Sequence, residues 1–82
     1  MPELTFDELA AMHARASAAT EGPWKSFIEG RDHFGGSDVI RTEGEDIELT
    51  GATQADQDFI ASARQDVPRL IAEVCRLRAW KL

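Results

Sequence analysis

The side chains of this sequence that most readily act as an acid, a base or a nucleophile near neutral pH are two histidines, His13 and His33, and one cysteine, Cys75. A general base needs a nucleophile beside it and a pocket for the substrate. His13 falls within a helical pattern, where a core or helix-edge histidine is expected, and His33 falls in a polar loop. Arg76 could favour the thiolate of Cys75, yet a half-buried helical cysteine is the better interpretation. We therefore expect no catalytic residues. Without a glycine-rich phosphate loop or a dinucleotide fingerprint, we expect no cofactor either.

Four acidic side chains follow one another closely in the middle of the chain: Glu43, Glu45, Asp46 and Glu48. Carboxylates are ligands for hard cations, but this spacing lacks the alternating oxygen ligands of a calcium loop. A solvated turn and strand face is the simplest interpretation, and we expect no metal site. The same charges could meet a basic partner, so these residues are the secondary candidate for a partner-binding site.

The basic residues gather near the C-terminus, where residues 64–82 carry a net charge of +3 against −9 for residues 1–63. Such cations could replace the counterions of nucleic-acid phosphates. The candidate contacts are Arg69, Arg76, Arg78 and Lys81. The overall charge of −6 argues against general nucleic-acid binding, and Glu73 can form intrahelical ion pairs with two of these arginines. A nucleic-acid-associated regulator is therefore the alternative hypothesis, and nucleic acid is not the expected partner.

An amphipathic helix at the end of the chain would position these basic groups. Asp66 is a good N-cap, and Pro68 suits the first turn. Apolar residues then recur at alternating steps of three and four, the a/d pattern of a coiled coil over about two heptads. The candidates for self-association or partner binding are Val67, Leu70, Ile71, Val74, Leu77 and Trp80. Because 82 residues with one cysteine have a small core and no internal disulfide, we expect a homodimer.

The whole pattern predicts a single small α+β domain over residues 1–82. An N-terminal helix is expected within residues 1–22 and a three-stranded antiparallel sheet within 23–51, because short alternating segments there are separated by turn residues. A pair of helices is expected within 52–82, of which the last is the amphipathic one.

Two threonines mark the starts of helices. Thr5 and Glu8 fit a capping box, in which each side chain accepts a hydrogen bond from the other residue's backbone amide. Thr53 can cap the first helix of the C-terminal pair, which we expect to run to about Arg64. The inner face of that helix is expected to carry Phe59, Ile60 and Ala63, with Phe59 and Ile60 against the sheet.

Two short motifs carry a resemblance to a known family. Residues 19–24, Ala-Thr-Glu-Gly-Pro-Trp, resemble an A-T-P-G-P-W signature, with Glu21 in place of the usual proline. Residues 58–63, Asp-Phe-Ile-Ala-Ser-Ala, resemble a later D-A-x-F-I-A-x-A segment. Together, in this order, they are similar to the Ead-type early proteins of lambdoid phages. The segment after the second motif differs from the lambdoid versions, which places the chain nearer the shorter proteins of actinobacterial phages and prophages.

This resemblance implies an early or accessory phage gene without catalytic chemistry. We therefore expect a non-enzymatic phage accessory protein that acts through protein–protein interaction, by binding and inhibiting a host protein in the most specific form of the hypothesis. The start of the chain lacks the basic and apolar regions of a signal peptide, and no apolar run reaches transmembrane length. The expected location is therefore the cytoplasm of the host cell, away from the membrane.

Overall fold

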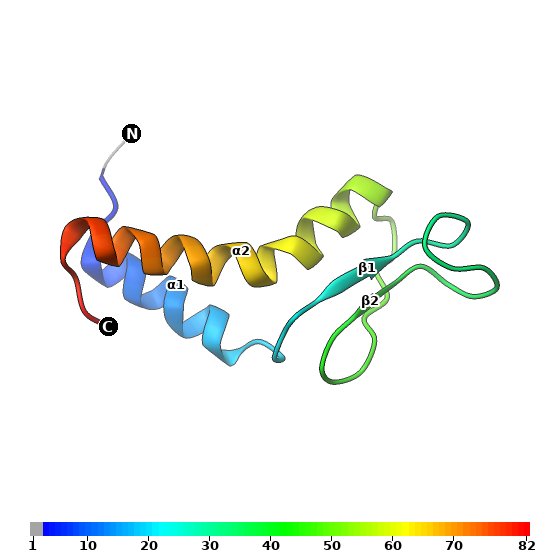
Figure 1. Ribbon diagram of the computed structural model, residues 1–82, viewed down its shortest axis with the longest axis horizontal. Coiled ribbons are helices and arrows are strands. Elements are labelled where there is room, and N and C mark those ends of the chain that lie inside the picture. The colour runs from blue at the N-terminus through cyan, green and yellow to red at the C-terminus, as the bar shows by residue number, and fades with distance from the viewer. Residues whose placement is uncertain (1–2) are drawn as a thin grey trace.

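The computed structural model describes residues 3–82 and has an α+β fold with four elements. In chain order these are α1 (Phe6–Ala18), β1 (Lys25–Phe27), β2 (Val39–Arg41) and α2 (Gln54–Arg78). The two helices lie side by side and run in opposite directions, with the start of α1 and the C-terminus at one end of the molecule and the sheet at the other (Figure 1).

The helix starts predicted at Thr5 and Thr53 are confirmed. The Thr5 hydroxyl accepts a hydrogen bond from the Glu8 amide at 3.1 Å, and the Glu8 carboxylate accepts one from the Thr5 amide at 3.0 Å. Thr53 and Asp56 form the same reciprocal pair at the start of α2, with both bonds at 3.0 Å. Each box satisfies amide donors that have no partner within the helix.

The predicted pair of C-terminal helices is wrong, because α2 is one helix of 25 residues that continues through Pro68. A proline inside a helix removes one backbone hydrogen bond and its ring crowds the carbonyl four residues earlier, at a cost of about 3 kcal/mol. Contacts on both sides of the proline offset this cost: Gln57 and Ala61 are buried before it and Ile71 after it. The helix changes direction in its middle (Figure 1), as expected where a proline interrupts the ladder.

The predicted three-stranded sheet is also wrong, because only β1 and β2 form a ladder, antiparallel, with Ser26 opposite Ile40. The expected third strand is reduced to one bridge, in which Ile40 and Ile47 exchange two backbone hydrogen bonds of 2.8 and 2.9 Å. The turn between them is wide: the Thr42 hydroxyl donates to the Glu45 carbonyl and accepts from the Gly44 amide. The chain then turns away toward the α2 cap before a second pair can form.

The core is small and the molecule is long. The buried apolar side chains among residues 3–82 are Leu9, Ile28, Ile40, Ala61 and Ile71. The molecule extends 48 Å along its longest axis, and its radius of gyration is 15.3 Å. A compact domain of this length would have a radius of gyration of about 12 Å. This elongation leaves a large share of the apolar side chains without cover.

Two glutamines fasten the sheet to α2. The side-chain amide of Gln57, which is 3% exposed, donates to the Ser26 hydroxyl at 2.9 Å and to the carbonyls of Phe27 and Val39 at 3.3 and 3.1 Å. Gln65 accepts from the Trp24 amide at 2.6 Å and donates to the Trp24 carbonyl at 3.1 Å. The residues are eight apart, so they lie on one face of the helix. They fix which side of α2 turns toward the protein.

Candidate functional site: the outer face of helix α2

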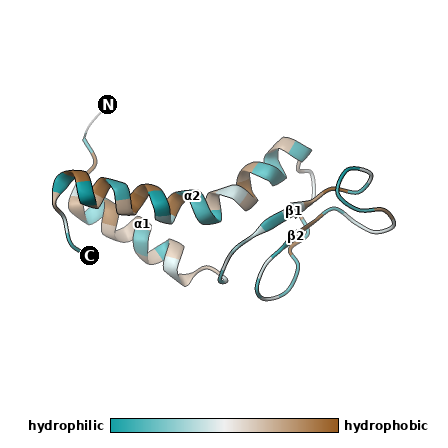
Figure 2. Cartoon of the chain, in the orientation of Figure 1, coloured by the Kyte–Doolittle hydropathy of each residue, from teal (hydrophilic) through white to brown (hydrophobic). Residues whose placement is uncertain are grey.

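Helix α2 has an inner face that meets the sheet and α1 and an outer face that meets solvent. Gln57, Ala61 and Ile71 are the buried residues of the helix, and they share a side because they are separated by four and ten residues. Residues about half a turn away must therefore point outward. Figure 2 shows apolar and polar bands alternating along the C-terminal part of α2.

The outer face carries an apolar stripe, which we call the outer stripe and define as Val67, Leu70, Val74 and Leu77. Val67 is 38% exposed, Leu70 63% and Leu77 69%, and Val74 is half-buried. Solvent-exposed leucines in series on one helix face are unusual for a monomeric domain and mark an interaction surface. The outer stripe thus contains four of the six residues proposed from the sequence for association.

The other two proposed residues are used inside the chain. Ile71 is 5% exposed and belongs to the inner face. Trp80 is half-buried and turns back over the start of α1, where its ring meets Phe6 edge-on at 5.6 Å. The Arg78 guanidinium lies 4.9 Å from the centre of the Trp80 indole. Trp80 therefore closes the end of the helix pair.

The continuous helix adds apolar residues that the sequence analysis placed on a separate helix. Ile60 and Ala63 continue the three- and four-residue spacing of the outer stripe toward the N-terminus of α2, and Ile60 is 37% exposed. The expectation that Phe59 and Ile60 cover the sheet is therefore wrong, and Phe59 is 74% exposed. The spacing of Ile60 and Ala63 is visible in the sequence, but the helix break predicted at Asp66 separates these two residues from the stripe.

An apolar groove borders the stripe between the two helices. Its volume is about 410 Å³, and its wall includes Met12 and Ala16 of α1, Trp24, and Val67 of α2. Met12 is itself 36% exposed. The exposed apolar surface therefore extends from the outer stripe toward α1.

Charges of opposite sign flank the outer stripe. Asp66 and Glu73 lie along one edge and Arg64 and Arg78 along the other, as their helical spacing requires. Arg64 donates to the Thr20 carbonyl at 2.9 Å, and Arg78 donates to the Leu4 carbonyl at 2.6 Å. These bonds hold the basic edge beside α1, whereas the acidic edge lies on the side away from it.

The secondary candidate, the acidic cluster, lies on the turn after β2, beside the connection between α1 and β1, where the Glu43 amide donates to the Glu21 carbonyl at 3.2 Å. Glu43, Glu45, Asp46 and Glu48 are all exposed on the segment that follows β2. Asp46 is 3.7 Å from Arg41 in an exposed ion pair, which contributes little to stability. The cluster is separate from the outer stripe.

The four basic residues proposed for nucleic acid do not form one face. Arg69 and Arg76 are seven residues apart and share a side of α2, whereas Arg78 lies on the opposite side. Arg76 is bonded to Glu73, and Lys81 follows the end of the helix. Two of the four cations, Arg76 and Arg78, are thus already held by contacts within the chain.

The two histidines and the cysteine that were candidates for catalysis do not gather at one site in the fold. His13 is exposed but lies at the edge of α1 that faces α2, where it lines a cavity with Ile71 and Cys75. The His33 ring lies edge-on to Phe27 at 6.3 Å, and its Nε2 is buried without a hydrogen-bond partner. Cys75 is half-buried on the side of α2 that faces α1. Within residues 3–82, no three histidine, cysteine or acidic side chains lie close enough to hold a metal ion.

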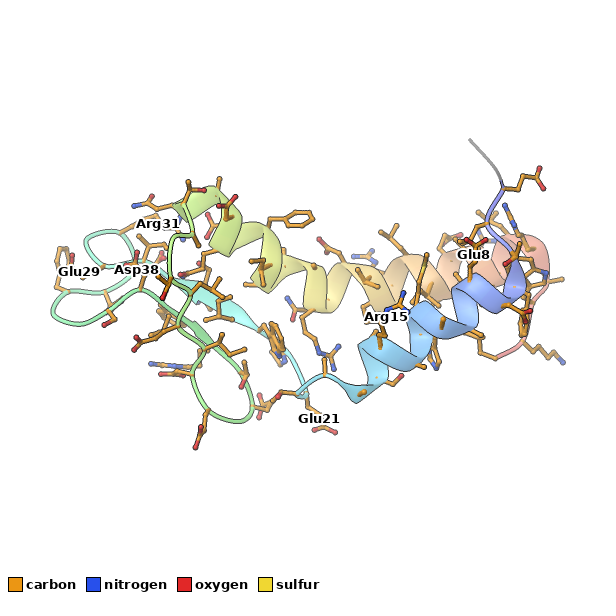
Figure 3. The ribbon with its side chains drawn as sticks, turned by 180° about the vertical axis from the view of Figure 1, so that it is seen from behind. Glu8, Arg15, Glu21, Glu29, Arg31 and Asp38 are labelled. Atoms are coloured by element: carbon orange, nitrogen blue, oxygen red, sulfur yellow. The ribbon has the colours of Figure 1, made fainter. Side chains whose placement is uncertain are left out.

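A group of ion pairs fastens the loop after β1 to the start of α2. Figure 3 shows Arg31 at this end of the molecule, near Glu29 and Asp38. Arg31 donates to both carboxylate oxygens of Asp58 at 2.9 Å and also bonds to Asp32. Hydrogen bonds from Arg31 and then from Ser26 lower the pKa of Asp58 to about 2. The same guanidinium lowers the pKa of Asp32 and has its own pKa raised.

These contacts give both sequence motifs a role in the fold. Asp58 opens the second motif and binds Arg31. In the first motif, the Thr20 carbonyl accepts hydrogen bonds from the Trp24 indole and from Arg64, both at 2.9 Å. The motifs therefore position α2 and leave its outer face free.

Neither helix within residues 3–82 is long and apolar enough to cross a membrane. Comparisons of the chain with protein-family models, with curated proteins and with solved structures found no match. The similarity to Ead-type early proteins stays a prediction from the two motifs.

Proposed function

We propose that this protein is a non-enzymatic phage accessory protein that acts in the host cytoplasm by binding other proteins, with the outer stripe of α2 as its binding surface. The observation that carries the proposal is the exposure of Leu70 and Leu77, at 63% and 69%, on a helix whose opposite face is already packed. A helix with a free apolar face is the common ligand of hydrophobic grooves and of other helices.

The phage assignment rests on the two motifs, and host inhibition is its most specific form. A small protein that acts only by binding needs an interaction surface and does not need a catalytic site. The dispersed positions of His13, His33 and Cys75 favour binding over catalysis. The split distribution of the basic residues gives no support to the nucleic-acid alternative.

The test is affinity capture from a lysate of the bacterial host, using the tagged protein and its Leu70→Asp/Leu77→Asp variant. A matched control is Ser62→Asp, an exposed position on α2 that lies off the stripe. We expect a host protein retained by the wild type and by Ser62→Asp to be lost with the stripe variant, and the purified host protein to bind with the same pattern. Equal retention by all three proteins would refute the stripe as the binding surface.

A further inference from the structure

We infer that the outer stripe pairs with the same stripe of a second copy of this chain, with the two α2 helices parallel. This inference rests on the proposed use of the stripe as a binding surface and names its occupant. The stripe has β-branched Val67 and Val74 at the a positions and Leu70 and Leu77 at the d positions. That combination favours a two-stranded parallel coiled coil.

The flanking charges determine the direction. In a parallel pair, a g residue of one helix meets the e residue five positions later in the other, so acidic Glu73 faces a basic residue of the second copy, whereas Asp66 faces Ile71. Glu73 would lie opposite Arg78, five residues later in the second helix. In an antiparallel pair, the acidic edges would face each other. Opposite charges thus favour the parallel arrangement, and like charges oppose the alternative.

The pairing is short and therefore weak. It involves the part of α2 from Val67 to Leu77, because the helix changes direction in its middle (Figure 1). Two heptads bury less than the roughly 1,600 Å² of a standard stable interface. We expect a dimer whose formation depends on concentration. Its parallel geometry brings the two sheets and the two acidic clusters to the same end.

Sedimentation equilibrium tests whether a second copy of the chain occupies the outer stripe. Wild-type protein and Ser62→Asp should associate to dimers as concentration rises. Leu70→Asp/Leu77→Asp should weaken the association by about 100-fold or more, because a carboxylate in an apolar seam is costly to bury. Both substituted leucines are exposed, so the variant should keep its fold, which circular dichroism verifies. A wild type that stays monomeric at millimolar concentration would overturn the inference.

Cross-linking tests the direction in a Cys75→Ser background. Val67→Cys and Leu77→Cys lie at the two ends of the stripe. In a parallel pair, each cysteine faces its own copy, so each variant alone should form a disulfide-linked dimer. In an antiparallel pair centred on the stripe, like positions lie about 15 Å apart, beyond disulfide reach. Cross-linking only in a mixture of the two variants would overturn the parallel assignment.

A charge exchange gives an independent measurement. Glu73→Arg and Arg78→Glu chains should each dimerise more weakly than the wild type, and an equimolar mixture should recover association as a heterodimer. Failure of the mixture to recover would contradict the predicted pairing.

The outcomes separate this inference from the proposed function. Host-protein capture that depends on the stripe, by a chain that never dimerises, would refute self-association and leave the proposed function standing. A parallel dimer whose stripe variants still capture every host protein would support self-association and refute the stripe as the host-binding surface.

Discussion

Leu70 and Ile71 are adjacent in the sequence, yet the structure assigns them opposite roles, and replacing each with alanine provides a quantitative test. Ile71 is 5% exposed and Leu70 is 63% exposed. Truncating a buried isoleucine to alanine typically costs 2–5 kcal/mol, so we take about 3 kcal/mol for Ile71→Ala. Leu70→Ala should cost about 0.5 kcal/mol or less, because the side chain is solvated and both residues favour helices.

The difference is large for a domain of this size. An 82-residue domain is stable by roughly 4–12 kcal/mol, so Ile71→Ala removes a substantial part of the total. At about 4–8 °C per kcal/mol, the melting temperature should fall by about 12–24 °C. If Ile71→Ala is too unstable to study, Ile71→Val should still cost about 0.5–1.5 kcal/mol.

The assay is urea unfolding at micromolar concentration, followed by circular dichroism. Repeating it at higher concentration separates folding from association, because dimerisation stabilises the folded state by mass action. The Leu70→Ala penalty should grow with protein concentration, whereas the Ile71→Ala penalty persists at every concentration. Equal penalties at micromolar concentration would refute the division of α2 into inner and outer faces.

Three further predictions concern contacts that position α2. Gln57→Leu should destabilise the fold by about 1–3 kcal/mol in urea unfolding, because a buried side-chain amide with three acceptors is removed; an unchanged midpoint would contradict this. Trp80→Ala should cost about 1–2 kcal/mol through its lost contacts with Phe6 and the neighbouring guanidinium, and a loss below about 0.3 kcal/mol would refute the end-closing role. The pKa of Asp58, followed by carboxyl NMR, should be about 2 and rise toward about 3.9 in Arg31→Ala. Because this pKa is depressed in the folded state, the stabilisation is present above about pH 4 and is lost as pH falls toward 2; an unchanged pKa in the variant would exclude the arginine as its cause.

The helix starts could be predicted because their determinants are local. A threonine followed three residues later by an acidic residue satisfies two backbone amides whatever the rest of the chain does, and both Thr5 and Thr53 act in this way. Apolar spacing likewise identified the outer stripe. These features depend on residues within one turn of each other.

The errors arose where distant contacts decided the structure. Pro68 by itself favours a new helix start, but packing on both sides keeps α2 continuous. The segment that begins at Ile47 has the composition of a strand. It forms only a single bridge because the residues after it lead to the α2 cap. The direction of Trp80 depends on Phe6, 74 residues earlier. None of these outcomes has a local signal.

The measurement that tests the central claim most directly is a concentration series of backbone amide NMR spectra of the wild-type chain. Self-association through the outer stripe predicts that the amide signals of Val67, Leu70, Val74 and Leu77 move together as concentration rises. Those of Gln57 and Ala61, on the inner face, should stay fixed. Concentration-dependent shifts confined to the acidic segment after β2, or spectra identical from micromolar to millimolar concentration, would contradict it.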